Sequence, residues 1–300
     1  MEIDKRNGNV VFNNEFHKYW DITDESKKYI SVTTLIEKYG QPFNEEFWSK
    51  YKTLQRVAPD AFQMEKKNLL LRKKWNSEIL KTYGISEKEF EKAQKDILDE
   101  WKKNNEEACK RGTKIHADIE NSFYDNPNNK ELRKFVKGGK FVCKKDYTDL
   151  DLEYGVYPEY LIYRESDDGV LLLAGQVDLI IKKGNHIIIA DHKTNGHIDT
   201  QSFYDSSTKS NVKMKYPLNK LDDSNFWHYT MQLSTYAWML QKINPNFIID
   251  DLILNHYDHN GNNRLYHCEY LKKEVELMLA HYKKQLLLEK NREKRKRIEY

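Results

Sequence analysis

Two aspartates and a lysine in neighbouring predicted strands are the residues of this chain best suited to chemistry. Asp178 lies in the apolar stretch VLLLAGQVDLIIKK, and Asp191 and Lys193 close the stretch NHIIIADHKT. Carboxylates that share an apolar patch raise each other's pKa, and a divalent cation relieves their repulsion. A lysine beside them would place a positive charge near an attacking water or a phosphate. The bland alternative is a structural ion pair between Asp191 and Lys193, because Asp-x-Lys is a common sequence.

Strand alternation predicts that these side chains share one face of a sheet. A hairpin with its turn at 183–184 would bring Asp178 roughly opposite Ile189. Asp191 would then lie one diagonal away, and Lys193 would follow on the same face. The alternation turns the neighbouring His192 side chain to the other face.

A third acid joins this patch from the preceding strand. A turn at 167–168 would place Glu159 near Gln176, again on the face of the two aspartates. Three carboxylates in one patch form an oxygen-rich site, which suits Mg²⁺. We therefore expect one or two Mg²⁺ or Mn²⁺ ions at this position, acting on a phosphate ester.

These residues match a known family. The pattern GQVDLI…IIIADHKT resembles the core motif of the PD-(D/E)XK nucleases, and in particular their RecB-like exonuclease branch. Four further segments resemble that branch or its viral and phage members, in the order ISVTTLI (30–36), GTKIHADIE (112–120), PEYLIY (158–163) and MQLSTY (231–236). The third acid is an aspartate, where many members of the superfamily carry glutamate.

The resemblance implies a ligand set for the metal. His116 would bind it through an imidazole nitrogen together with Asp178 and Asp191, and the backbone carbonyl of His192 would be a further ligand. The second imidazole nitrogen of His116 would need an acceptor of its own. A histidine ligand predicts that Mn²⁺ serves at least as well as Mg²⁺, and that activity falls as the ring protonates below about pH 6.

The resemblance also implies roles around the metal. Lys193 would be catalytic, and Glu159 would bind a second metal or position water. The DNA-binding candidates are Gln232, which would brace the site or contact DNA, Tyr236, which would stack or support it, and Arg111 and Lys114, which flank His116. For each residue the structural alternative is a core or solvated side chain.

The order of predicted elements gives an α/β fold with a mixed central β-sheet flanked by helices. Three strands from about residue 150 are followed by a helix at 226–243 and another strand. The resemblance implies a restriction-endonuclease-like core. Before it, a hairpin at 9–20 with an Asn-Asn turn and a strand-then-helix segment at 29–40 precede a run of helices at 44–110, whose last helix is expected to break near Gly112.

The expected organisation therefore has three parts. Residues 1–110 form an N-terminal hairpin and an α-helical lobe, residues 111–285 form the nuclease core, and residues 286–300 are a basic helix end. The segment KNREKRKR (290–297) there is read either as a solvated helix end or as a further DNA-tracking surface.

Composition limits the alternatives. The 300 residues carry a net charge of only +3, so charge alone does not argue for nucleic acid. The three cysteines are scattered and cannot hold a four-cysteine iron–sulfur cluster. No apolar run is long enough for a membrane span. We expect an intracellular, cytoplasmic protein, in the host cytoplasm if its origin is viral.

The expected function is a Mg²⁺- or Mn²⁺-dependent DNA exonuclease in recombination or DNA processing, in a phage or mobile-element setting. DNA is the expected partner, with a recombinase, annealing protein or helicase on a separate chain and no membrane. Three alternatives stay open at this point: an endonuclease of the same superfamily, a catalytically inactive DNA-binding or assembly module, and an RNA nuclease.

Overall fold

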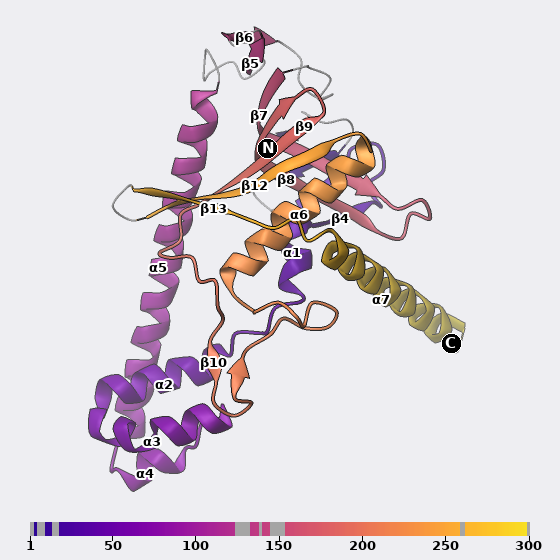
Figure 1. Cartoon of the computed structure of the whole chain (residues 1–300). Coiled ribbons are helices and arrows are strands. Elements are labelled where there is room, and N and C mark those ends of the chain that lie inside the picture. The colour runs from indigo at the N-terminus through magenta and orange to yellow at the C-terminus, as the bar shows by residue number, and fades with distance from the viewer. Residues whose placement is uncertain are drawn as a thin grey trace.

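The computed structural model describes residues 3–4, 10–13, 18–123, 133–137, 140–144, 154–258 and 262–298. A mixed nine-stranded sheet lies at its centre, with helices on both sides (Figure 1). This confirms the predicted α/β class with a mixed sheet. The strands of this sheet are β1 (Ile3–Asp4), β2 (Val10–Asn13), β3 (Lys18–Asp21), β4 (Lys28–Ser31), β7 (Tyr154–Glu165), β8 (Leu172–Lys183), β9 (His186–Lys193), β12 (Ile248–Tyr257) and β13 (Asn263–His267).

The strand order is β1-β2-β3-β4-β8-β9-β12-β13, with β7 paired to β8 as well. The predicted antiparallel meander β7-β8-β9 is confirmed, and β12 joins β9 in parallel after a helical crossover. β7 runs along the whole of β8, so β4 and β9 share the opposite edge of that strand. β4 pairs there at Leu173 and Ala174, and β9 pairs from Leu179 onward. The gap between these two partners contains Asp178.

The helices of the described residues are α1 (Val32–Glu37), α2 (Glu45–Val57), α3 (Pro59–Arg72), α4 (Glu78–Thr82), α5 (Glu87–Ser122), α6 (Asn225–Ile243) and α7 (Lys272–Ile298). Ser31 caps the start of α1, where its side chain accepts a hydrogen bond from the Thr34 amide. None of these helices is long and apolar enough to cross a membrane.

The main core lies between the sheet and the helices α1, α6 and α7. Apolar side chains of α6, including Met231, Leu233 and Ala237, pack on strand residues such as Ile180 and Ile189, all of them buried. A smaller cluster of Val156, Leu179 and Ala190 packs with Phe123, which directly follows α5. The sheet is therefore covered by α6 on one face and approached by the C-terminal end of α5 on the other.

The helical lobe has a core of its own, formed by apolar residues of α2, α3, α4 and the start of α5. Figure 1 shows this lobe at one end of α5, away from the sheet. The excursion between β9 and α6 reaches down to it through two short strands, β10 (Tyr204–Asp205) and β11 (Ser210–Asn211). Lys73 Nζ lies 2.7 Å from Asp205 Oδ2 and ties the two together.

The described structure corrects the expected break near Gly112, because α5 runs unbroken through that residue. An isolated glycine costs a helix only about 1 kcal/mol, which the contacts at both ends of α5 offset. A Cβ atom on Gly112 would lie 3.1 Å from Thr194 Oγ1, so the glycine lets the helix approach the end of β9. The expected boundaries at 110–111 and 285–286 both fall inside helices.

The N-terminal hairpin is present as the antiparallel pair β2–β3, in which Asn13 pairs with Lys18. The second residue of the expected turn, Asn14, lies outside the described residues. The small pair β5 (Arg133–Lys137) and β6 (Lys140–Lys144) follows α5. The basic segment expected at 290–297 lies in the last turns of α7, which project away from the sheet (Figure 1).

The predicted registers were wrong by two residues in both hairpins of the meander. In β8–β9, Lys183 pairs with His186, so the turn consists of Gly184 and Asn185 and Ile189 pairs with Ile180. Gly184 has φ +58°, a conformation that glycine adopts at little cost, and this fixes it as the first turn residue.

The β7–β8 hairpin is displaced in the same way. Its turn is centred on Asp168 and Gly169, with Gly169 at φ +64°, and Leu161 rather than Glu159 pairs with Gln176. A shift of two residues preserves which face each residue occupies, whereas a shift of one would reverse it. In the observed register Glu159 aligns with Asp178, and Asp178 aligns with Asp191.

Candidate metal centre and active site

A local distortion of β7 sets the direction of Glu159. Tyr157 and Tyr160, three residues apart, both pack in the core beneath α6, while Val156 packs on the opposite face. Regular alternation would put residues three apart on opposite faces, so the alternation is interrupted between them. Glu159 lies at the interruption with φ +46°, the left-handed region, which is strained for a residue with a side chain.

The neighbouring strand is interrupted at the aligned position. Val177 and Ile180 pack beneath α6, whereas Leu179 packs on the face of Phe123. Asp178 lies at this second interruption, at the point where β8 and β9 separate. Its Oδ2 accepts the backbone amide of His192 at 2.7 Å and so links the separating strands. The single shared face predicted from strict alternation is therefore wrong for the two distorted positions.

His116 approaches these two carboxylates from α5. Its Nδ1 lies 3.5 Å from Asp178 Oδ2 and 3.6 Å from Glu159 Oε1. One ligand atom from each of the three residues lies within 4.8 Å of the other two, which makes a group able to hold a metal ion. Asp191 is not a member of this compact group, although the sequence assigned it to the ligand set and gave Glu159 an accessory place.

The other nitrogen of His116 is fixed by the backbone. Nε2 lies 2.9 Å from the His192 carbonyl oxygen, and because a carbonyl only accepts, Nε2 donates. The lone pair of the neutral ring then resides on Nδ1, toward Glu159 and Asp178. A histidine ligand needs this kind of acceptor behind it. The His192 carbonyl, expected as a metal ligand, thus contacts His116 in this structure.

The Asp191 side of the site is closed by side chains of α6. Lys193 Nζ lies 2.6 Å from Asp191 Oδ2, and Gln232 Nε2 donates to Asp191 Oδ1 at 2.9 Å. Lys193 Nζ also donates to Gln232 Oε1 at 3.4 Å and lies 4.6 Å from the centre of the Tyr229 ring. The ion pair that was the structural alternative for Asp-x-Lys is present next to the His116 group, with Asp191 buried and Lys193 half-buried.

Tyr236 lies one helical turn after Gln232 and accepts a hydrogen bond from Gln232 Nε2 at 3.4 Å. Its ring lies against Gly175 of β8, where a Cβ atom would come within 2.5 Å of Tyr236 Cε1. Tyr236 is buried at 3% exposure, so it supports the site from within the core. A base of DNA does not reach this ring in the observed arrangement, which disfavours the stacking role.

Burial and mutual repulsion raise the pKa values of the buried carboxyl groups. Burial, with the Glu159 charge next, raises the pKa of Asp178 to about 6. Burial also raises the pKa of Asp191 to about 6, against the opposing charge of Lys193. Burial would lower the pKa of His116, but Glu159 and Asp178 outweigh it and raise the pKa to about 9.

Lys193, on the α6 side of the site, is held in its charged form. Burial alone would lower the pKa of Lys193, but Asp191 and Asp178 outweigh it and raise the pKa above its usual value. The His192 ring, between His116 and Tyr257, behaves in the opposite way, because burial lowers its pKa to about 4. It is a neutral, buried ring whose nitrogens find no hydrogen-bond partner among the described residues.

The remaining predicted residues lie outside the two groups. Arg111 is half-buried and donates to the Thr194 carbonyl oxygen at 3.2 Å, so it braces the end of β9. Lys114 is exposed on α5, two residues before His116. The sequence reasoning missed Tyr229, which contacts Lys193 through its ring. Its spacing of three residues before Gln232 on one helix face could have indicated it.

Comparison with known proteins adds little to this geometry. No protein-family model matches the chain, and no curated protein matches it. Five solved chains match. One is the crystal structure of SSO0001, which is 16% identical over 87% of this chain and 77% of the other, with a TM-score of 0.30. Another is the crystal structure of a "putative exonuclease" from Eubacterium rectale, 16% identical over 84% of this chain and 87% of the other, with a TM-score of 0.34. Likenesses this remote carry no argument about activity.

Proposed function

We propose that the chain is a divalent-metal-dependent deoxyribonuclease that acts on DNA ends, an exonuclease. One observation carries the proposal: three potential metal ligands, His116, Glu159 and Asp178, converge beside a half-buried Lys193 held by Asp191. The two groups lie at the point where β8 and β9 separate. The motif resemblance around Asp178 and Lys193 supports the same assignment.

The donor set fits Mg²⁺ or Mn²⁺. It consists of two carboxylates and an imidazole whose far nitrogen is already satisfied by the His192 carbonyl. Carboxylate oxygens suit both ions, and Mn²⁺ accepts imidazole more readily than Mg²⁺ does. Among the described residues, His116 is the ion-pair partner of both carboxylates, and their charges raise its pKa to about 9. This arrangement favours a cation between the three residues.

When bound, the metal would lower the pKa of a coordinated water and neutralise charge on a scissile phosphate. His116, Glu159 and Asp178 would hold it, with Asp191 as an adjacent ligand for the same or a second ion. Lys193 would orient the attacking water and offset the negative charge that develops on the phosphate. Its raised pKa keeps it cationic, so it would act as a point charge and not as a base.

The α6 side chains would position this machinery. Gln232 holds Asp191 and Lys193 at once, and Tyr236 supports Gln232 from the core. We place DNA on the open side of the site, near Lys114, where the described side chains are exposed. Recombination or DNA processing in a phage or mobile-element setting, with a separate recombinase, annealing protein or helicase, completes the proposal.

A single gel tests the activity. End-labelled linear DNA, closed circular DNA and end-labelled RNA are each incubated with the protein and Mn²⁺ or Mg²⁺, with Lys193→Ala as the control for contaminating nucleases. The proposal predicts loss of the linear DNA and survival of the circle. Cleavage of the circle would assign an endonuclease. Loss of RNA in place of DNA would change the substrate, and no cleavage of any of them would leave a binding module.

A further inference from the structure

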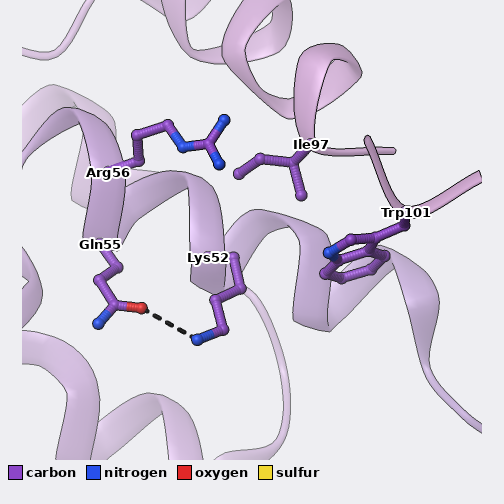
Figure 2. A pocket seen from close by; sticks show the side chains of 5 residues that line it. All are labelled: Lys52, Gln55, Arg56, Ile97 and Trp101. Atoms are coloured by element: carbon purple, nitrogen blue, oxygen red, sulfur yellow. Dashed lines mark hydrogen bonds between the residues drawn. The ribbon is translucent and has the colours of Figure 1, made fainter. Parts of the chain in front are cut away.

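A pocket between α2 and α5 of the helical lobe lies far from the proposed metal centre. It has a volume of about 370 Å³, within the range of small-ligand sites. Its lining comes from Lys52, Gln55 and Arg56 of α2 and from Ile97 and Trp101 of α5. Figure 2 shows these side chains around an open space, with the Trp101 ring on one side and the α2 side chains on the other.

The lining combines an aromatic face with cations. Trp101 is half-buried, and Ile97 forms an apolar floor at 2% exposure. Phe43, 66% exposed, lies against Trp101 with ring centres 5.9 Å apart and extends the aromatic surface into solvent. Exposed aromatic surface is unfavourable in water, so an exposed aromatic pair of this kind indicates a ligand with an apolar face.

The polar rim indicates the charge of that ligand. Lys52 bonds only to the neutral Gln55 among the contacts described for it, at 3.2 Å, so its charge is not neutralised. Arg56 is held by Glu100 through two hydrogen bonds, at 2.9 and 2.8 Å, which fixes its side chain at the rim. An aromatic face beside an ammonium group that has no carboxylate partner among the described residues fits a nucleobase with its attached phosphate, since bases stack on aromatic rings and phosphates bind cations.

The pocket is rigidly connected to the metal centre. Trp101 and His116 belong to the same unbroken helix, fifteen residues apart, which corresponds to about 22 Å along the axis. They lie within about 60° of one another around it, on the same side of α5. A DNA strand whose bases stay stacked, with the duplex rise of about 3.4 Å per nucleotide, covers that distance in about six or seven nucleotides.

We propose that the pocket lined by Trp101 and Lys52, with Phe43 beside Trp101, is a stacking subsite for one base of a DNA single strand, about six or seven nucleotides from the point of cleavage. The inference rests on the proposed function for its substrate class. Its test is a binding measurement, so it does not depend on whether the strand is cut.

The experiment measures binding of a fluorescently labelled twenty-nucleotide thymidine strand by anisotropy, in EDTA, to the full chain. Trp101→Ala should weaken binding about 5- to 100-fold, the range found when a base-stacking ring is removed. Trp101→Phe should recover most of the affinity. Lys52→Ala should lower the slope of log affinity against log salt concentration by about 1, which corresponds to the loss of one phosphate contact.

Two further variants guard the interpretation. Phe43→Ala removes a side chain that is mostly exposed, so it should weaken binding without disturbing the fold, and it replaces Trp101→Ala if that variant does not fold. Tyr83→Ala is the matched control: Tyr83 is an exposed aromatic residue of the same lobe and does not line the pocket. It should bind the strand like the wild type.

Four results would overturn the subsite. They are unchanged affinity in both Trp101→Ala and Phe43→Ala, an equal loss in Tyr83→Ala, an equal loss for blunt duplex DNA, and no binding of the strand by the wild type. If the variants weaken binding but the wild type cuts no nucleic acid, the subsite stands and the nuclease proposal falls. If the wild type cuts linear DNA but the variants bind normally, the reverse holds.

Discussion

The two sides of the candidate site differ in how completely their charges are satisfied. On the α6 side, Asp191 has Lys193 on one oxygen and Gln232 on the other, and Lys193 also contacts Tyr229. On the α5 side, Glu159 and Asp178 share one imidazole at 3.5–3.6 Å. The first side is preorganised before any ligand arrives. The second is short of positive charge, and that shortage is what a divalent cation would relieve.

The largest effect on activity should come from the α6 side of the site, at Lys193. Lys193→Ala should lower kcat by about 10²-fold or more, because the charge it supplies acts mainly in the transition state. Metal binding should be nearly unchanged, since Lys193 is not a ligand. Steady-state rates on linear DNA, with DNA affinity measured separately, test this. Wild-type kcat in the variant would remove Lys193 from the mechanism and leave it as the partner of Asp191 only.

An intermediate effect should appear on the α5 side, at His116, as a pH dependence of Mn²⁺ affinity. Without metal, the pKa of His116 is raised to about 9, so the ring is protonated at neutral pH and a metal must displace one proton. Mn²⁺ affinity should therefore fall about tenfold per pH unit as the pH decreases from 9 toward 7. His116→Ala should lose that slope and keep a weaker dependence near pH 6, where Asp178 protonates. Calorimetry in two buffers of different ionisation enthalpy measures the proton released; equal slopes in both proteins would contradict the role of His116.

The smallest effect concerns the stability of the metal-free protein. The pKa of Asp178 in the folded chain is raised to about 6 from 3.8, so ionised Asp178 destabilises the fold. Its stabilising contribution is complete below pH 3.8 and is lost as the pH rises through about 6. Asp178→Asn removes the loss of stability that ionisation causes, and the asparagine oxygen can still accept a hydrogen bond from the His192 amide. In EDTA at pH 8 the variant should melt a few degrees above the wild type, with no difference near pH 4. A lower melting temperature at pH 8 would mean that Asp178 is a structural ion-pair partner.

The sequence predicted most of the fold, because the strands and helices follow from local patterns. Alternation, the Ser31 cap and the apolar face of α6 each act over a few residues. The register of the two hairpins was missed by two residues, since it depends on which residue takes the left-handed conformation in each turn, Gly184 and Gly169. Because the register error was two residues, each strand residue stayed on its predicted face of the sheet, apart from the distorted positions.

The structure brings together several residues that the sequence singled out, and it groups them differently. Alternation cannot anticipate the interruption at Glu159 and Asp178, which is a tertiary distortion. The ligand set that joined Asp191 to His116, with Glu159 in an accessory place, came from the family resemblance. Contacts that depend on helix packing were also out of reach, such as His116 with the His192 carbonyl and Lys193 with the Tyr229 ring. The pocket beside Trp101 needs α2 and α5 to lie together, and no motif indicates that.

A calorimetric titration of Mn²⁺ at pH 8 into four variants and the wild type tests the central claim most directly. If His116, Glu159 and Asp178 form the metal centre, His116→Ala, Glu159→Gln and Asp178→Asn should each bind Mn²⁺ at least about tenfold more weakly than the wild type. Lys193→Ala, the matched change on the satisfied side, should bind it as the wild type does. Equal affinity in all five proteins, or a loss confined to Lys193→Ala, would contradict the claim.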